Sequence, residues 1–155
     1  MDLKFSFGGA TPDHDHGSHG EAGQDPALTG VPLPFTVTPA SKSSVLEVHV
    51  RCSDTQVIAE AVSGDSVTYA RSEVDEAARD PAALARAVSS ATARVVAGLE
   101  GPLAEAVSGV ILSLGGSEQA VVVALGFGND VASPLTSEAF QRRTGVTSGT
   151  PVHIA

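Results

Sequence analysis

The sequence predicts a single α/β domain with a flexible N-terminal arm. The domain should contain a three-stranded antiparallel meander, then a helix and a central strand. Apolar and polar residues alternate in three consecutive stretches of residues 45–74, the period of strands with one buried face. Apolar residues then recur every three or four positions over 84–99, as on one helix face. A continuous apolar run at 109–114 has the length of a buried strand.

The first two expected strands form a hairpin. In residues 45–50, Val45, Glu47 and His49 alternate with the apolar residues Leu46, Val48 and Val50. Residues 56–62 alternate in the same way. The polar stretch at 52–55 is short enough to be a turn. These patterns predict two antiparallel neighbours.

A third expected strand at residues 66–74 follows a second turn at 63–65. Its alternation puts Val67, Tyr69 and Arg71 on one face. Short turns between successive strands give an antiparallel meander.

The helix over residues 81–98 has a clear start. Asp80 is a good N-cap, because its carboxylate accepts a bond from a free backbone N–H, and Pro81 is tolerated at the first helical position. Glycine ends the helix within 98–101. The apolar stripe is Leu84, Val88, Ala91, Val95 and Leu99.

The remaining expected elements are a helical turn (102–107), a central strand covered on both faces (109–114), a turn (115–117), a fifth strand (120–125) and a closing helix (136–144). Thr136 or Ser137 would cap the closing helix.

Residues 1–44 are rich in glycine, proline, histidine and small polar residues, which predicts a flexible arm. Its histidines His14, His16 and His19 lie among aspartates and could bind zinc or nickel. Their spacing matches no closed structural site. Both a solvated tail and a metal-delivery segment stay open as interpretations.

Composition restricts the partners. The formal net charge of −9 argues against nucleic acid and anionic membrane surfaces, because both require clustered basic residues. No apolar run has the roughly 20 residues that cross a bilayer, and the first residues do not resemble a signal peptide. The single cysteine, Cys52, cannot form an internal disulfide. We therefore expect a cytoplasmic protein.

Four segments carry a resemblance to a known family: VLEVHVRCSDTQVIAEAV, ARDPAALARAVSSATARVVAGL, VSGVILSLGG and GNDVASPLTSEAFQRRTG. Together they resemble the N-terminal lobe of FGGY-type carbohydrate kinases. The resemblance implies a ribonuclease-H-like, actin-like ATPase order of strands over residues 45–155.

In that family the first hairpin holds an Asp-x-Gly-Thr turn that grips a nucleotide phosphate. The matching turn here contains Ser53, Asp54 and Thr55 and no glycine. Glycine allows the backbone N–H groups to approach the phosphate closely. We therefore expect a degenerate phosphate turn and no binding of ATP with magnesium.

The resemblance also implies sugar contacts. Gly115, Gly116 and Gln119 lie where the family has a sugar-binding turn, and Asn129 and Asp130 lie where it has an Asn-Asp pair. The same residues are also typical of ordinary turns and loops. The later segments that carry the family's catalytic base and adenosine pocket have no counterpart in these 155 residues.

We expect no catalytic residue. Cys52 has His49 three positions before it, and a regular strand places two such residues on opposite faces. The interpretation is a non-catalytic interaction module that binds a protein partner or forms a homo-oligomer. The alternatives are a carbohydrate kinase fragment or half-enzyme that binds sugar or nucleotide, and metal binding through the arm.

Overall fold

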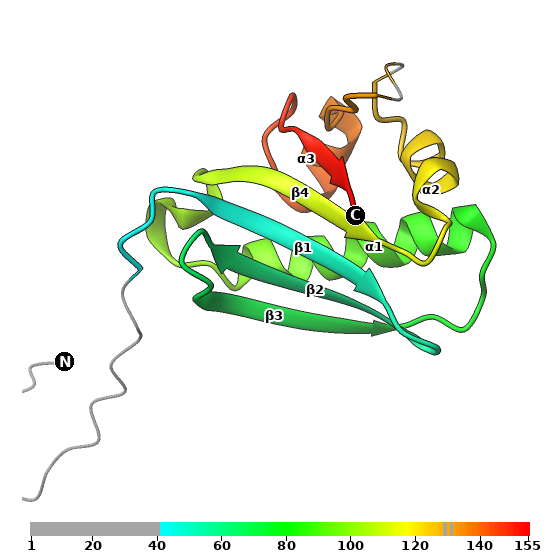
Figure 1. The fold of residues 1–155 in the computed structure, drawn as a ribbon, viewed down its shortest axis with the longest axis horizontal. Helices are drawn as coiled ribbons and strands as arrows, with labels where there is room; N and C mark the ends of the chain where they lie inside the picture. The colour runs from blue at the N-terminus through cyan, green and yellow to red at the C-terminus, as the bar shows by residue number, and fades with distance from the viewer. Residues whose placement is uncertain (1–40, 129, 131) are drawn as a thin grey trace, which may run out of the picture. The chain divides into compact units, whose positions relative to one another are not determined.

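The computed structural model describes residues 41–128, 130 and 132–155. In chain order its elements are β1 (Leu46–Cys52), β2 (Gln56–Ser63), β3 (Thr68–Asp75), α1 (Pro81–Ala97), the 3-10 helix η1 (Gly101–Ala104), β4 (Val107–Ser113), α2 (Glu118–Ala124), α3 (Glu138–Thr144) and β5 (Val152–Ile154) (Figure 1). The chain is thus an α/β protein with one five-stranded mixed sheet.

The strands lie side by side in the order β3-β2-β1-β4-β5. The first three pair antiparallel, which confirms the predicted meander. β4 is parallel to β1, and β5 is parallel to β4. In this register His49 lies opposite Glu60 on one side and Ile111 on the other.

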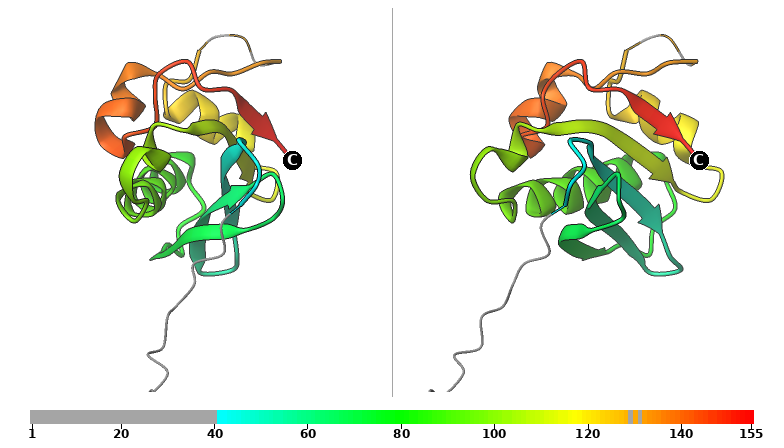
Figure 2. Two further views of the ribbon diagram at one scale, coloured as in Figure 1. Left: turned by 90° about the vertical axis from the view of Figure 1, so that its left-hand side faces the viewer. Right: turned by 60° about the vertical axis from the view of Figure 1, so that its left-hand side comes forward.

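The three α-helices of the described residues, α1, α2 and α3, lie on one side of the sheet (Figure 2). α1 packs against β2 and β3 and also contacts α2 and α3. The core between sheet and helices includes Val48 on β1, Leu84 on α1 and Val110 on β4, all with no exposed area. Burying such side chains contributes about 1.5–3 kcal/mol each.

The predicted start of α1 is confirmed. Asp80 is the N-cap and its Oδ1 accepts a hydrogen bond from the backbone N–H of Ala83 at 3.0 Å. Pro81 is the first helical residue. α3 is likewise capped by Ser137, whose hydroxyl accepts from the N–H of Phe140 at 3.3 Å.

The strand predicted at residues 120–125 is wrong, because this segment is helix α2. Its three consecutive valines fit a strand locally. In the structure Val121, Val122 and Leu125 are buried while Val123 is 73% exposed, which is the period of a helix. Contact of α2 with α1 decides between the two periods. The fifth strand is instead β5, close to the end of the sequence.

The third strand also differs from its simple alternation. Ala61 faces Ala70, but Val62 faces Thr68, so Tyr69 is an extra residue in a β-bulge. Tyr69 packs against the core, whereas Arg71 bonds Glu60 on the opposite face. The expected common face of Tyr69 and Arg71 is therefore wrong.

The sheet face opposite the helices is not covered by any helix or strand that the structure describes. β4 has a neighbour on each side, but the predicted central position belongs to β1, because only β5 lies beyond β4. On β4, Ser108 is exposed and Ile111 is only half-buried. The expectation that both faces of this strand are covered is therefore wrong within the described chain.

Residues 41–44, which the sequence assigns to the arm, contact the β2–β3 turn. The Asp65 carboxylate accepts hydrogen bonds from the Ser41 hydroxyl, the Lys42 backbone N–H and the Ser63 hydroxyl. The Ser41 N–H donates to the Tyr69 hydroxyl at 2.9 Å. The rest of the arm, with His14, His16 and His19, lies outside the described residues.

Candidate functional site

A crevice opens at the carboxyl ends of the parallel strands β1 and β4. Its volume is about 380 Å³, and it is lined by Cys52, Ser53, Asp54, Arg79, Leu114, Gly115 and Ser117. The turn between β1 and β2 forms one wall, and the turn between β4 and α2 forms the other. Ligands of open α/β sheets usually bind outside the carboxyl ends of the strands. We therefore take this crevice as the candidate site.

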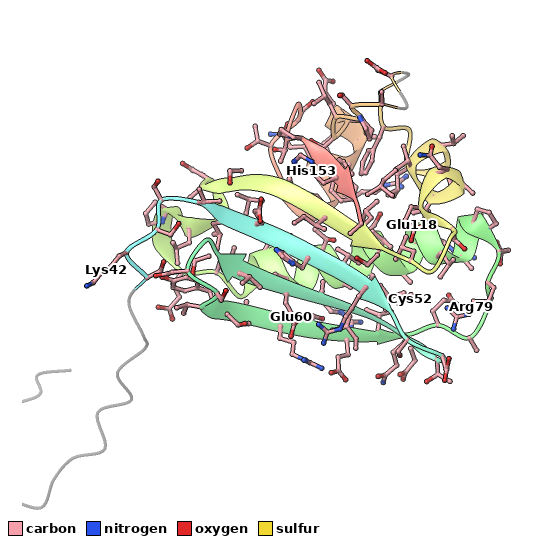
Figure 3. The ribbon with its side chains drawn as sticks, in the orientation of Figure 1. Lys42, Cys52, Glu60, Arg79, Glu118 and His153 are labelled. Carbon is pink, nitrogen blue, oxygen red and sulfur yellow. The ribbon has the colours of Figure 1, made fainter. Side chains whose placement is uncertain are left out.

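Arg79 closes the first wall. One guanidinium nitrogen, Nη1, lies 2.6 Å from the Cys52 Sγ, and Nη2 donates to the carbonyl oxygens of Ser53 at 2.7 Å and Asp54 at 2.6 Å. Figure 3 shows Arg79, on the segment before α1, close to the end of β1 at Cys52. The Ser53 N–H is used within the hairpin, where it donates to the Gln56 carbonyl at 2.8 Å. The turn thus presents carbonyl oxygens to a cation.

Glu118 fills the second wall. Its Oε1 accepts hydrogen bonds from the backbone N–H groups of Leu114 at 2.6 Å and Gly116 at 3.2 Å. Gly115 and Gly116 have φ values of +66° and +95°, which a residue with a side chain rarely adopts. This backbone turns successive N–H groups toward one point, and the carboxylate occupies that point. The Glu118 residue is only 7% exposed.

Two opposing effects act on the pKa of Glu118. Burial raises this pKa, because it disfavours the charged form, while bonds from the N–H groups of residues 114, 115, 116 and 118 lower it. The net direction is downward. The Glu118 carboxylate is therefore charged at neutral pH and held by the turn.

The structure brings together two groups of residues that the sequence suggested separately. Ser53 and Asp54, from the expected phosphate turn, line the same crevice as Gly115, from the expected sugar turn. Thr55 and Gly116 belong to the same two turns, and the Thr55 carbonyl accepts a bond from the Glu76 N–H at 2.8 Å.

The other expected sugar contacts lie elsewhere. Gln119 lines a separate groove of about 280 Å³ together with Ala132, Pro134, Val152, His153 and Ile154. Asp130 is exposed, and its Oδ1 accepts a bond from the Ala132 N–H at 3.1 Å. Asn129 lies outside the described residues. Among the described residues, Gly115 and Gln119 thus line different hollows of the surface.

Sequence reasoning did not identify the roles of Arg79 and Glu118. Arg79 stands directly before the helix cap, where a charged residue is typical of a solvated helix start. Glu118 follows a Gly-Gly-Ser turn, and an acidic residue there suits the start of a helix. That signal was hidden because the following valines were interpreted as a strand.

Charged residues cross the uncovered sheet face. Glu60 pairs with Arg51 at 2.5 Å and with Arg71 at 2.7 Å, and Arg71 also pairs with Glu73 at 2.6 Å. The Glu60 side chain is 15% exposed, so its two arginines largely shield it from water. Glu60 also begins a row of residues that lie opposite one another on neighbouring strands: Glu60, His49, Ile111 and His153. Figure 3 labels the two ends of this row, Glu60 and His153.

Within the part of the chain that the structure describes, no group of three or more histidine, cysteine, aspartate or glutamate side chains could hold a metal ion. None of the helices described there is both long and apolar enough to cross a membrane. A scan against protein-family models found no match for this chain, and a search of the curated proteins found none.

Proposed function

We propose that this chain is a non-catalytic interaction module that binds a second copy of itself or another protein. We further propose that its sheet has the ribonuclease-H-like order of a sugar-kinase N-terminal lobe. The support for the order is the arrangement β3-β2-β1-β4-β5 with antiparallel first strands and parallel β4 and β5.

The observation that carries the non-catalytic assignment is that side chains of the protein itself fill both walls of the crevice. Arg79 donates hydrogen bonds to the carbonyl oxygens of the β1–β2 turn, and Glu118 accepts hydrogen bonds from the N–H groups of the β4–α2 turn. A phosphate is held by converging N–H groups. Here the converging N–H groups already bond the Glu118 carboxylate. Charge repulsion from this carboxylate opposes the binding of a phosphate beside it.

The uncovered sheet face supports an interaction role. Parallel strands are almost always covered on both faces. Here β1, β4 and β5 are parallel, and His49, Ile111 and His153 lie in register across the side without a helix. A second protein that packs on this row would supply the missing layer.

Light scattering on the purified chain tests the proposal. We expect a dimer or larger assembly at micromolar concentration, and a clean monomer would contradict self-association. Ile111→Glu places a charge in the middle of the surface on which the second protein would pack, so this variant should be monomeric. Val123→Glu makes the same change on the exposed surface of α2 and should still assemble. Circular dichroism checks that both variants fold.

The second candidate is half of a carbohydrate kinase, and it is favoured by the meeting of Ser53, Asp54 and Gly115 in one crevice. It predicts a rise in melting temperature with ATP and magnesium, or with a pentose or hexose. A ligand that binds only the folded state stabilises it by RT ln(1 + [L]/Kd). No shift with any of these ligands would exclude this candidate.

A further inference from the structure

The turn between β4 and α2 has the features of an anion-binding nest. Leu114 and Gly116 direct their N–H groups to a single carboxylate oxygen, and the bond from Leu114 is short, at 2.6 Å. Bonds of this length between N–H groups and an ionised acceptor are about twice as strong as neutral ones. The backbone at Gly115 and Gly116 is held in the left-handed region that this convergence requires.

The group in the nest belongs to the chain itself. Glu118 lies only two residues beyond Gly116 and is 7% exposed, so its carboxylate acts as a tethered anion. A tethered ligand has a high effective concentration and excludes a free competitor of similar chemistry.

Space and charge beside the nest suit a small anion. Gly115 also lines the crevice of about 380 Å³, and Arg79 supplies a guanidinium on the opposite wall. A Cβ built at Gly115 or Gly116 would meet no atom within 4 Å, so the turn is open on its outer side. Asp54 lines the same crevice and opposes binding, so we expect millimolar affinity.

We infer that the turn at residues 114–116 is an anion site that the chain keeps closed with its own Glu118 carboxylate, and that an oxyanion such as inorganic phosphate enters when this side chain is removed. The inference goes beyond the proposed function, because it holds whether or not the protein assembles.

Two variants of the full chain test it. Glu118→Ala empties the nest, whereas Glu118→Gln removes the charge but still fills the space. Phosphate is titrated at constant ionic strength while the amide signals of residues 114–116 are followed by NMR. Glu118→Ala should show saturable shifts and bind phosphate at least about tenfold more tightly than Glu118→Gln or the unchanged chain, as one or two charge-assisted hydrogen bonds imply. No saturable shift in folded Glu118→Ala, or equal shifts in all three proteins, would overturn the inference.

A second measurement needs no variant. As pH falls, the amide protons of Leu114 and Gly116 should shift together with the carboxyl carbon of Glu118 in one common titration. Amide protons that do not follow the Glu118 carboxyl would show that it does not occupy the nest, and the inference would fail even if Glu118→Ala did not fold.

Discussion

Thr92 provides a test of how buried polar groups affect the stability of this fold. Thr92 lies on α1 with no exposed area, and its hydroxyl has no hydrogen-bond partner among the described residues. Thr144, on α3, is 4% exposed, but its hydroxyl donates to the Phe140 carbonyl at 2.9 Å and accepts from the Val146 N–H at 3.2 Å. The two threonines thus share burial and helical setting and differ in hydrogen bonding.

Replacing each threonine by valine exchanges the hydroxyl for a methyl group of similar size. A buried hydroxyl without a partner costs about 1–3 kcal/mol. Thr92→Val removes that cost, so the free energy of unfolding should rise by about 1–2 kcal/mol. Thr144→Val loses one bond and leaves the Val146 N–H unpaired, so the free energy of unfolding should fall by about 1–3 kcal/mol.

Urea denaturation followed by circular dichroism measures both effects. The sequence contains no tryptophan, which makes fluorescence a poor probe. The midpoint should move up for Thr92→Val and down for Thr144→Val, with an unchanged slope of free energy against urea. A Thr92→Val protein that is no more stable than the unchanged chain would refute the reasoning, because the hydroxyl would then have a partner such as an internal water.

Three further predictions concern carboxylates. Hydrogen bonds from the Ser41 and Ser63 hydroxyls and the Lys42 N–H lower the pKa of Asp65 to about 2. Its stabilising effect is therefore present at neutral pH and lost as pH falls from its ordinary value of 3.8 toward 2, so an Asp65→Asn variant and the unchanged chain should converge in melting temperature over this range. Glu118→Gln should lower the free energy of unfolding by about 1–3 kcal/mol at pH 7. Because the pKa of Glu118 is lowered on folding, the difference in stability between this variant and the unchanged chain should shrink at acid pH. A difference that stays constant with pH would contradict the charge assigned to Glu118. Glu60→Gln should lower the free energy of unfolding by about 1 kcal/mol in urea denaturation, with less effect at high salt. Glu138→Gln is the control and should change stability little, because the Glu138 side chain is 83% exposed. Equal effects of the two substitutions would refute the role assigned to the ion pairs of Glu60.

The elements that sequence predicted well are those in which local chemistry and period agree. At α1 the pair Asp80-Pro81 marks the start, and the apolar stripe has the same helical period as the buried face. The hairpin of β1 and β2 likewise combines alternation with a polar turn. Each of these segments carries its own signal, so no distant contact is needed to place it.

The errors arise where distant contacts decide. Residues 118–124 are helical because α2 packs against α1, and this contact overrides the strand preference of valine. β5 has three residues, and its parallel partner β4 lies far earlier in the chain. The crevice was only half-predicted. The turns were identified, but Arg79 bonds the carbonyl oxygens of Ser53 and Asp54, far earlier in the chain. The bond of Glu118 to Leu114 is local, but it forms at the start of helix α2, which the strand prediction missed.

The bulged edge strand β3 limits how this protein can polymerise. It presents the charged residues Arg71, Glu73 and Asp75, and Arg94 from α1 donates to the Glu73 carbonyl at 3.3 Å. An incoming strand would have to displace that guanidinium and bury the charges, so growth from this edge is disfavoured. A fibril that grows by strand pairing needs two edge strands that can pair on every subunit. A sheet in which one edge is protected can add at most a single neighbour in this way. Assembly by strand pairing should therefore stop at two chains and not continue into fibrils.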